Sequence, residues 1–335
     1  MVRGAQCLQE MRHDGGEKMN ADRWQVAVTQ PDRLGESPFW HPLERMLYWV
    51  DIPARQLRRS DGAGGGVESW TMPSEPGCIA PAASGGLVIA LRDGIYRARS
   101  WGSAPTLIAR FDHDVATTRF NDGKADPAGR MWAGTMYEPR DARQAALYSI
   151  DCRAGNGAGG KPVVERKAGD ATIANGLAWS PDGKTVYWSD TTRHLVQAWD
   201  WDRDSNAMSG QRVFQQFPGK PQGWQPGQPE LPGSVSYGGR PDGAAVDSQG
   251  NYWCAMYEGG RLLQFSPDGE LLADIAVPAM CPTMPCFGGD DLRTLYLTTA
   301  SDKRPAAELV QRPESGCVFS TRVKVAGLPA NFFID

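Results

Sequence analysis

Short apolar runs separated by turns of Gly, Pro, Asp and Ser fill the chain from residue 24 onward. No segment keeps the 3.6-residue spacing of a long amphipathic helix, so the pattern predicts strands throughout. Six of the runs resemble one another, and they begin at Leu47, Leu87, Met131, Val186, Tyr252 and Leu295. Three of the five intervals between them are about 40–45 residues long, the length of a four-stranded propeller blade. An all-β, six-bladed β-propeller is therefore predicted, because a pair of β-sandwiches would explain the strands but not the period.

The two longer intervals contain insertions, a Gly-rich one at residues 153–161 and a Gly/Pro-rich one at residues 218–239. Ahead of the repeats, residues 1–18 are polar and lack the apolar core of a secretory signal. We therefore predict a disordered tail over residues 1–23 and a single propeller domain over residues 24–335.

Composition and charge limit the partners of this chain. The 335 residues are 41% hydrophobic and include 12 Trp, which is ample for a sizeable core. Lys and Arg number 35 against 39 Asp and Glu, and no basic run occurs. This balance predicts that the chain binds no nucleic acid. No apolar stretch approaches the roughly 18 residues of a membrane span, so no membrane partner is predicted either.

Cysteine and histidine usage argues against a sulfur- or imidazole-based site. The seven Cys are scattered without a C-x-x-C pair, and the four His form no H-x-x-x-H pair. This pattern predicts reduced thiols in a cytoplasmic protein, with Cys281 and Cys286 packed in the core rather than forming a redox pair. Phosphate-binding glycine loops and the G-x-S-x-G elbow are also absent from the sequence. Any chemistry must therefore come from carboxylates, amides and arginine.

Four repeats carry a polar residue at the same register, ten or eleven positions before the conspicuous run. These residues are Glu36, Asn121, Asn175 and Asp242. The first strand of each blade lines the central channel of a propeller, so equivalent positions converge at one height. Carboxylates in a narrow channel repel one another, and a bound cation removes that cost. The shared register predicts a site for a hard divalent cation such as Ca²⁺, Mg²⁺, Mn²⁺ or Fe²⁺.

Arginine and further carboxylates are expected around this site. Arg119 lies two residues before Asn121, so both side chains of an extended strand point to one face. Because the second strand of the blade returns antiparallel, Tyr137 and Glu138 are expected near the mouth of the channel. The same logic places three carboxylates at the inner ends of their own blades, where we expect supporting hydrogen bonds from Asp51, Asp190 and Glu258.

At these residues the sequence resembles the senescence-marker-protein, regucalcin and gluconolactonase family of six-bladed propellers. The matching strings lie between residue 34 and about residue 320, and include LGESPFW, RFNDGKADPAGRMWAGTM, NGLAWSPDGKTVYWSD and PDGAAVD. The resemblance implies that Glu36, Asn175 and Asp242 bind one divalent metal. It also implies that Arg119 and Asn121 bind substrate. An acidic substrate contact follows the AGTM string in this family, and here Glu138 fits one alignment while Pro139 fits the other.

The resemblance implies a cytoplasmic, metal-dependent lactonase that opens a gluconolactone-like aldonolactone to the aldonate. Asp242 is then expected to act as general base on a water, with the metal polarising the lactone carbonyl. Ca²⁺ is the first expectation for the metal, with Zn²⁺, Mn²⁺, Mg²⁺ and Fe²⁺ as alternatives. Two other functions stay open: a calcium-binding regulatory or ligand-binding propeller without turnover, and a promiscuous esterase or phosphotriesterase. Neither the sugar nor the oligomeric state follows from the sequence.

The insertion at residues 218–239 is longer than in the vertebrate members of this family, so the rim of the pocket should differ. Its Pro and Gly content opposes regular structure, which predicts a surface loop that helps to choose the substrate without entering the chemistry. Its aromatic residues, Trp224 and Tyr237, could either stack on a sugar or anchor the loop to the propeller.

Overall fold

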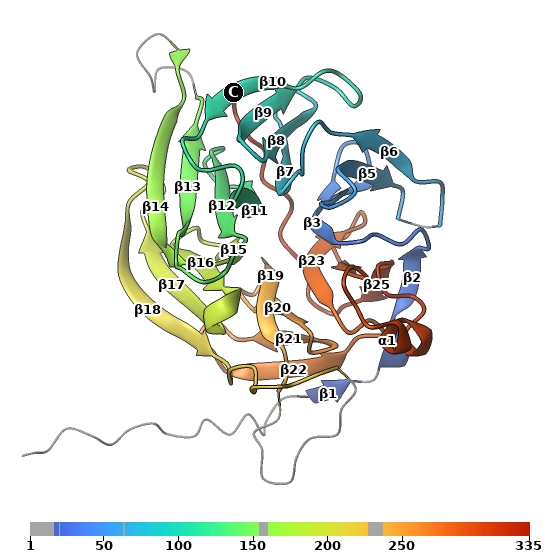
Figure 1. Ribbon diagram of the computed structural model, residues 1–335. Coiled ribbons are helices and arrows are strands. Elements are labelled where there is room, and N and C mark those ends of the chain that lie inside the picture. The colour runs from blue at the N-terminus through green and yellow to red at the C-terminus, as the bar shows by residue number, and fades with distance from the viewer. Residues whose placement is uncertain (1–16, 20, 63, 154–159, 227–236) are drawn as a thin grey trace, which may run out of the picture.

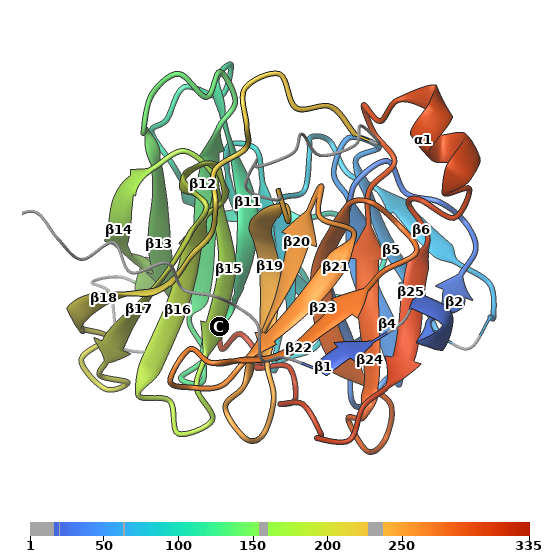
Figure 2. The ribbon, with the colours of Figure 1, turned by 90° about the horizontal axis from the view of Figure 1, so that it is seen from below.

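The computed structural model describes residues 17–19, 21–62, 64–153, 160–226 and 237–335. Their strands form six sheets arranged radially around a central axis, as Figure 1 shows. Figure 2 gives the view turned by 90° and shows the strands of the blades running between the two ends of the axis. The structure therefore confirms the predicted six-bladed β-propeller.

The first four blades follow the order of the chain, with the innermost strand first. Blade one contains β3 (Gly35–His41), β4 (Met46–Asp51), β5 (Gln56–Ser60) and β6 (Glu68–Thr71). Blade two contains β7 (Cys78–Pro81), β8 (Leu87–Leu91), β9 (Gly94–Ala98) and β10 (Thr106–Arg110). Blade three contains β11 (Thr118–Ala125), β12 (Met131–Tyr137), β13 (Ala145–Asp151) and β14 (Val163–Ala171). Blade four contains β15 (Ala174–Trp179), β16 (Thr185–Asp190), β17 (Leu195–Trp201) and β18 (Met208–Gln216).

The last two blades take strands from both halves of the chain. Blade five contains β19 (Arg240–Val246), β20 (Tyr252–Tyr257), β21 (Arg261–Phe265), β22 (Leu271–Ala276) and the added outer strand β1 (Glu17–Met19). Blade six contains β23 (Pro282–Gly288), β24 (Thr294–Thr299), β25 (Val318–Arg322) and the outer strand β2 (Gln25–Val28). Short helices complete the described elements: the 3-10 helices η1 (Ala21–Arg23) and η3 (Thr191–Arg193), and the α-helix α1 (Ala306–Gln311).

The N-terminal segment closes the ring. Strand β2 pairs antiparallel with β25, so the outermost strand of blade six comes from the start of the chain. Strand β1 pairs parallel with β22, and Figure 1 shows it along the outer edge of blade five. The expectation of a disordered tail over residues 1–23 is thus wrong for residues 17–19 and 21–23, which form β1 and η1. Residues 1–16 and 20 lie outside the described residues.

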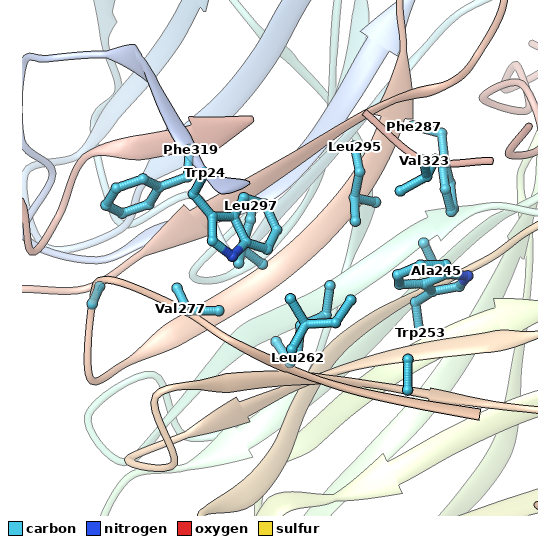
Figure 3. Close-up of a cluster of buried hydrophobic side chains, with 14 of the residues drawn as sticks. Trp24, Ala245, Trp253, Leu262, Val277, Phe287, Leu295, Leu297, Phe319 and Val323 are labelled. Atoms are coloured by element: carbon cyan, nitrogen blue, oxygen red, sulfur yellow. The ribbon is translucent and has the colours of Figure 1, made fainter. Parts of the chain in front are cut away.

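Apolar side chains fill the wedges between neighbouring blades. Figure 3 shows the cluster between blades five and six, in which Trp253 lies edge-on to Phe287 with ring centroids 5.9 Å apart. Trp24 joins the same cluster and donates a hydrogen bond from Nε1 to the Ala276 carbonyl oxygen at 2.8 Å. These contacts tie the N-terminal segment to the ring, because they bury an indole while satisfying its only donor.

Buried aspartates brace the turn between the first two strands of blades three and five. Asp126 accepts hydrogen bonds from the backbone N–H groups of Ala128 and Arg130 at 2.7 and 3.0 Å. It also accepts one from Trp132 Nε1 at 2.9 Å. Asp247 binds the backbone N–H of Asn251 and the indole of Trp253 in the same way. One carboxylate therefore closes the turn and positions the core Trp of the following strand.

We expect Asp126→Ala to lower the free energy of unfolding by about 3 kcal/mol or more. The change leaves Trp132 Nε1 and two backbone N–H groups without their acceptor, and it breaks the buried pair with Arg130. Denaturant titration followed by Trp fluorescence measures the loss. Asp182→Ala is the matched control, since Asp182 occupies the equivalent turn of blade four but is exposed, and should cost under about 1 kcal/mol. Equal losses in the two variants would contradict the bracing role.

The C-terminal segment lies across the end of the channel opposite the inner-strand starts. Phe333 is fully buried and exchanges backbone hydrogen bonds with Pro81 and Ala83 of blade two. The Gly327 N–H bonds to the Leu292 carbonyl oxygen of blade six, so the segment connects blades on both sides of the ring. No helix in the described ranges is long and apolar enough to cross a membrane. The six cysteines among the described residues are all free, including the buried Cys281 and Cys286.

Candidate active site

A pocket of about 530 Å³ opens at the end of the central channel where the inner strands begin. Glu36, Arg119, Asn121, Asn175 and Asp242 all line it, and each is at most 7% exposed. They come from β3, β11, β15 and β19, so four blades converge on one site as the repeat register predicted. Their roles as ligands or substrate contacts stay predictions.

Each of these four inner strands departs from regular pairing at the site residue. The register shifts between Glu36 and Phe39, between Phe120 and Gly123, between Asn175 and Ala178, and between Pro241 and Ala244. The inner strand of blade six shifts in the same way between Pro282 and Met284, whereas β7 of blade two, which begins after Pro76 and Gly77, pairs regularly. β-Bulges re-aim side chains and are common beside active sites. The bulges therefore explain how strand residues present their polar groups to the pocket.

The site residues form a continuous chain of hydrogen bonds. Arg119 Nη1 donates to Asn121 Oδ1 at 2.8 Å, and Asn121 Nδ2 donates to Asn175 Oδ1 at 2.9 Å. Asn175 Nδ2 then donates to Asp242 Oδ1 at 2.6 Å and to Thr191 Oγ1 at 2.8 Å. Because every link is buried, each side chain has one defined orientation. The chain connects an arginine on one wall to a carboxylate on the floor.

Two buried carboxylates, Glu36 and Asp242, lie at the floor close enough for their negative charges to interact. Burial and the negative charge of Asp242 raise the pKa of Glu36 well above its usual range. Burial likewise raises the pKa of Asp242, although Arg240 opposes the change. A cation bound between the two groups would favour their charged forms. The donor set therefore fits a hard metal ion better than an empty polar cavity.

The metal would have to use few anionic ligands. In the described part of the chain, no group of three or more His, Cys, Asp and Glu side chains comes together as a metal site. A metal here would therefore bind Glu36, Asp242 and the amide oxygen of Asn175. As placed, the Asn175 amide turns its nitrogen to Asp242 and its oxygen to Asn121. Rotating the amide would present the oxygen to the carboxylates.

One wall of the pocket belongs to blades two and three. Glu138 lies 3.5 Å from Arg119 Nε and also pairs with Arg92, which in turn approaches Glu75. Burial lowers the pKa of Arg119, whereas Glu138 acts to raise it. Glu138 lines the pocket and Pro139 does not, and a substrate contact by Glu138 stays a prediction.

The opposite wall is basic and was missed by the sequence analysis. Glu258 accepts from Lys220 Nζ at 2.9 Å, from Arg304 Nη1 at 3.2 Å, and pairs with Arg240 Nη2 at 3.4 Å. The sequence did contain one indication of Arg240. It lies two residues before Asp242, and Arg119 lies two residues before Asn121, so the same argument would have placed Arg240 at the site. Lys220 and Arg304 come from connecting loops and leave no repeat signature.

Residues 217–226, which follow β18, lie at the same end of the propeller as α1, as Figure 2 shows. Of the insertion at residues 218–239, residues 227–236 lie outside the described residues. Trp224 and Tyr237 contact each other edge to face at 4.8 Å, and Tyr237 is buried beside His194. Neither aromatic lines the pocket, so both anchor the loop, while Lys220 projects into the pocket.

Asp51 and Asp190 hold turns rather than facing the pocket. Asp51 accepts from the backbone N–H groups of Arg33 and Leu34 at 3.0 and 3.2 Å. Asp190 caps η3 by accepting from the Thr192 N–H at 3.2 Å. Tyr137, expected near the mouth, is not among the pocket-lining residues.

Comparisons with known proteins agree on one family. The SMP-30/Gluconolactonase/LRE-like region matches residues 34–301. A 6-deoxy-6-sulfogluconolactonase of Pseudomonas putida is 41% identical over 306 residues, covering 91% of this chain and 97% of that protein. Regucalcin of Gallus gallus is 34% identical, covering 89% of this chain and 93% of its own.

A solved structure shares the same architecture. The crystal structure of a calcium-binding protein, regucalcin, from Agrobacterium tumefaciens superposes with a TM-score of 0.81 at 25% identity. The match covers 94% of this chain and 98% of that one. Together with the family match over most of the propeller, these likenesses confirm the family predicted from the sequence motifs. The chain belongs to the SMP-30/gluconolactonase/LRE-like family of six-bladed β-propellers.

Proposed function

We propose that this chain is a lactonase that hydrolyses a sugar lactone to its aldonate in the pocket at the inner-strand starts. The observation that carries the proposal is the buried chain of hydrogen bonds from Arg119 to Asp242, with Glu36 facing the same pocket. The likeness to a 6-deoxy-6-sulfogluconolactonase and to regucalcins supports this choice of reaction.

Glu36, Asn175 and Asp242 would hold one divalent metal ion, with Ca²⁺ as the first candidate. When bound, the ion would supply Lewis-acid polarisation of the lactone carbonyl and offset the two floor carboxylates. Two carboxylates and one amide leave open positions around a hard cation, as metal-assisted hydrolysis requires.

Asp242 would act as general base. Its carboxylate takes a proton from a water whose oxygen attacks the carbonyl carbon of the lactone. Collapse of the tetrahedral intermediate breaks the bond between that carbon and the ring oxygen, and the ring oxygen receives the proton. The product is an open-chain hydroxy acid. Asn175 lies within 2.6 Å of Asp242 and would share the cation with it once its amide oxygen is turned to that side.

Arg119, Asn121 and Glu138 would bind the sugar. The guanidinium of Arg119 is fixed by Asn121 on one side and by Glu138 on the other. Such a preorganised fork of donors can bind sugar oxygens without first being ordered. Glu138 is the one partly exposed acceptor in this set, with a side chain 37% exposed, and can receive a sugar hydroxyl.

We expect chelation to abolish lactone hydrolysis and one divalent ion to restore it. Proton release from D-glucono-1,5-lactone is followed in metal-free protein and after addition of Ca²⁺, Zn²⁺, Mn²⁺ or Mg²⁺ in turn. Subtraction of the spontaneous hydrolysis rate is the control. Full activity of the metal-free protein would show that the reaction needs no metal. No turnover of any lactone with any ion, despite metal binding, would favour a binding propeller, and turnover of aryl esters alone would favour an esterase.

A further inference from the structure

The basic wall of the pocket carries more positive charge than its carboxylates balance. Lys220, Arg240 and Arg304 surround Glu258, and Arg304 also pairs with Glu308 at 2.7 Å. Three cations therefore face two carboxylates. Arg304 is only 6% exposed, so its charge is held in place rather than solvated on a mobile side chain.

The pocket as a whole, like its basic wall, has more cationic than anionic side chains. Seven cationic and six anionic side chains line it among the described residues. Two of those anions, Glu36 and Asp242, are the proposed metal ligands, whose charge a divalent ion would offset. The remaining walls then present seven cations and four anions. A pocket with this excess attracts an anionic ligand and disfavours a cationic one.

The position of the basic wall relative to Asp242 limits where the anion would sit. Arg240 precedes Asp242 by two residues on β19, and both line the pocket. At roughly 3.3 Å per residue, the two positions lie about 6.6 Å apart along an extended strand. That spacing suits a substituent at the far end of a six-carbon lactone whose carbonyl lies beside Asp242. The Arg240 side chain is 19% exposed and pairs with Glu258 through Nη2 at 3.4 Å, which leaves other donors of its guanidinium for a ligand.

We propose that Lys220, Arg240 and Arg304 form a subsite for a tetrahedral anion, a sulfonate or phosphate, on the substrate carbon remote from the lactone carbonyl. The inference rests on the proposed lactonase function and names its substrate class. Guanidinium groups present forked donors to the oxygens of such anions, and these strong acids stay ionised at neutral pH. The insertion that supplies Lys220 thereby acquires a role in substrate choice.

The test compares three substrates: D-glucono-1,5-lactone, its 6-phosphate, and its 6-deoxy-6-sulfonate. We expect wild-type kcat/KM to be higher for at least one anionic lactone than for the neutral one, and the two anionic lactones identify which group is preferred. In Lys220→Met, this preference ratio should fall by roughly tenfold, the loss typical of one charge-assisted hydrogen bond. Lys220→Arg should retain the preference. Lys184→Met, an exposed change in a turn at the other end of β15, is the matched control and should keep the wild-type ratio.

A binding experiment separates failure of the subsite from failure of the lactonase function. Calorimetric titration with gluconate and with 6-phosphogluconate needs no turnover. We expect 6-phosphogluconate to bind more tightly than gluconate. Lys220→Met should weaken the binding of 6-phosphogluconate more than it weakens the binding of gluconate. Equal affinities for the two acids, together with a preference ratio that Lys220→Met leaves unchanged, would overturn the subsite while leaving neutral-lactone hydrolysis intact. Absence of hydrolysis with preserved anion preference would instead overturn the proposed reaction.

Discussion

Asp242→Asn is expected to lower kcat for lactone hydrolysis by on the order of a hundredfold or more while the metal stays bound. The amide can still offer an oxygen to a cation, but it cannot accept a proton at neutral pH. The substitution is nearly isosteric, so the side chain at this position can still reach the cation. Steady-state rates at saturating metal, with metal content measured on the same sample, test this expectation.

The control for this variant is Asp182→Asn, which makes the same chemical change at an exposed turn outside the pocket. It should retain the wild-type rate. Near-normal turnover of metal-loaded Asp242→Asn would remove Asp242 from the role of base. Loss of the metal together with activity would show that Asp242 acts as a ligand, and the base would then have to be sought elsewhere on the pocket wall.

Glu36→Gln is expected to weaken metal affinity by about a hundredfold or more and to change the metal-saturated rate much less. Changes to groups that merely orient a ligand already cost roughly 10–100-fold in affinity, so loss of an anionic ligand should cost at least as much. Glu36 is not proposed to exchange protons with substrate, hence the smaller effect on rate. Calorimetric titration of chelator-treated protein with Ca²⁺ and activity at rising free metal provide the two measurements.

Glu75→Gln provides the comparison, because Glu75 lines the same pocket but lies on the wall beside Arg92. Its metal affinity should stay within a few-fold of wild type. An unchanged affinity in Glu36→Gln would exclude Glu36 as a ligand. A rate that falls as far as the affinity, even at saturating metal, would give Glu36 a direct part in the reaction.

The two variants test different parts of one electrostatic arrangement. Burial raises the pKa of both floor carboxylates, and a bound cation would favour their charged forms. Glu36→Gln removes part of the negative charge that attracts the cation. Asp242→Asn removes the proton acceptor as well as charge. A large loss of affinity in the first variant and a large loss of rate in the second would therefore assign the two roles separately.

The period of the apolar runs was sufficient to predict the architecture. Each blade repeats the same alternation of buried positions and turns, and a period near forty residues of strand can bury its surface only by stacking against like units. The same periodicity predicted that Glu36, Asn121, Asn175 and Asp242 meet, because equivalent positions of a radial repeat share one height on the axis. Arg119 followed from strand alternation alone.

The spacing of the apolar runs does not predict which segments far apart in the chain contact each other. The N-terminal strands β2 and β1 pair with β25 and β22 from the last quarter of the chain, and strands this short carry no sequence signal for their partners. Residues 1–23 were expected to be a disordered tail because the first 18 are polar. The bulges that turn the site residues into the pocket could not be predicted either, because a bulge is defined only by how two strands pair.

The sequence by itself determined the six blades, the family and the set of polar residues at the channel mouth, since these depend on local alternation and on repetition. The tertiary structure alone decided which of these side chains bond to one another and which loops complete the pocket. Lys220 and Arg304 come from loops of blades four and six, whose paths depend on anchors such as Trp224 against Tyr237. Electrostatic surroundings form only when such loops are brought together, and so the basic wall opposite Arg119 exists only in the folded chain.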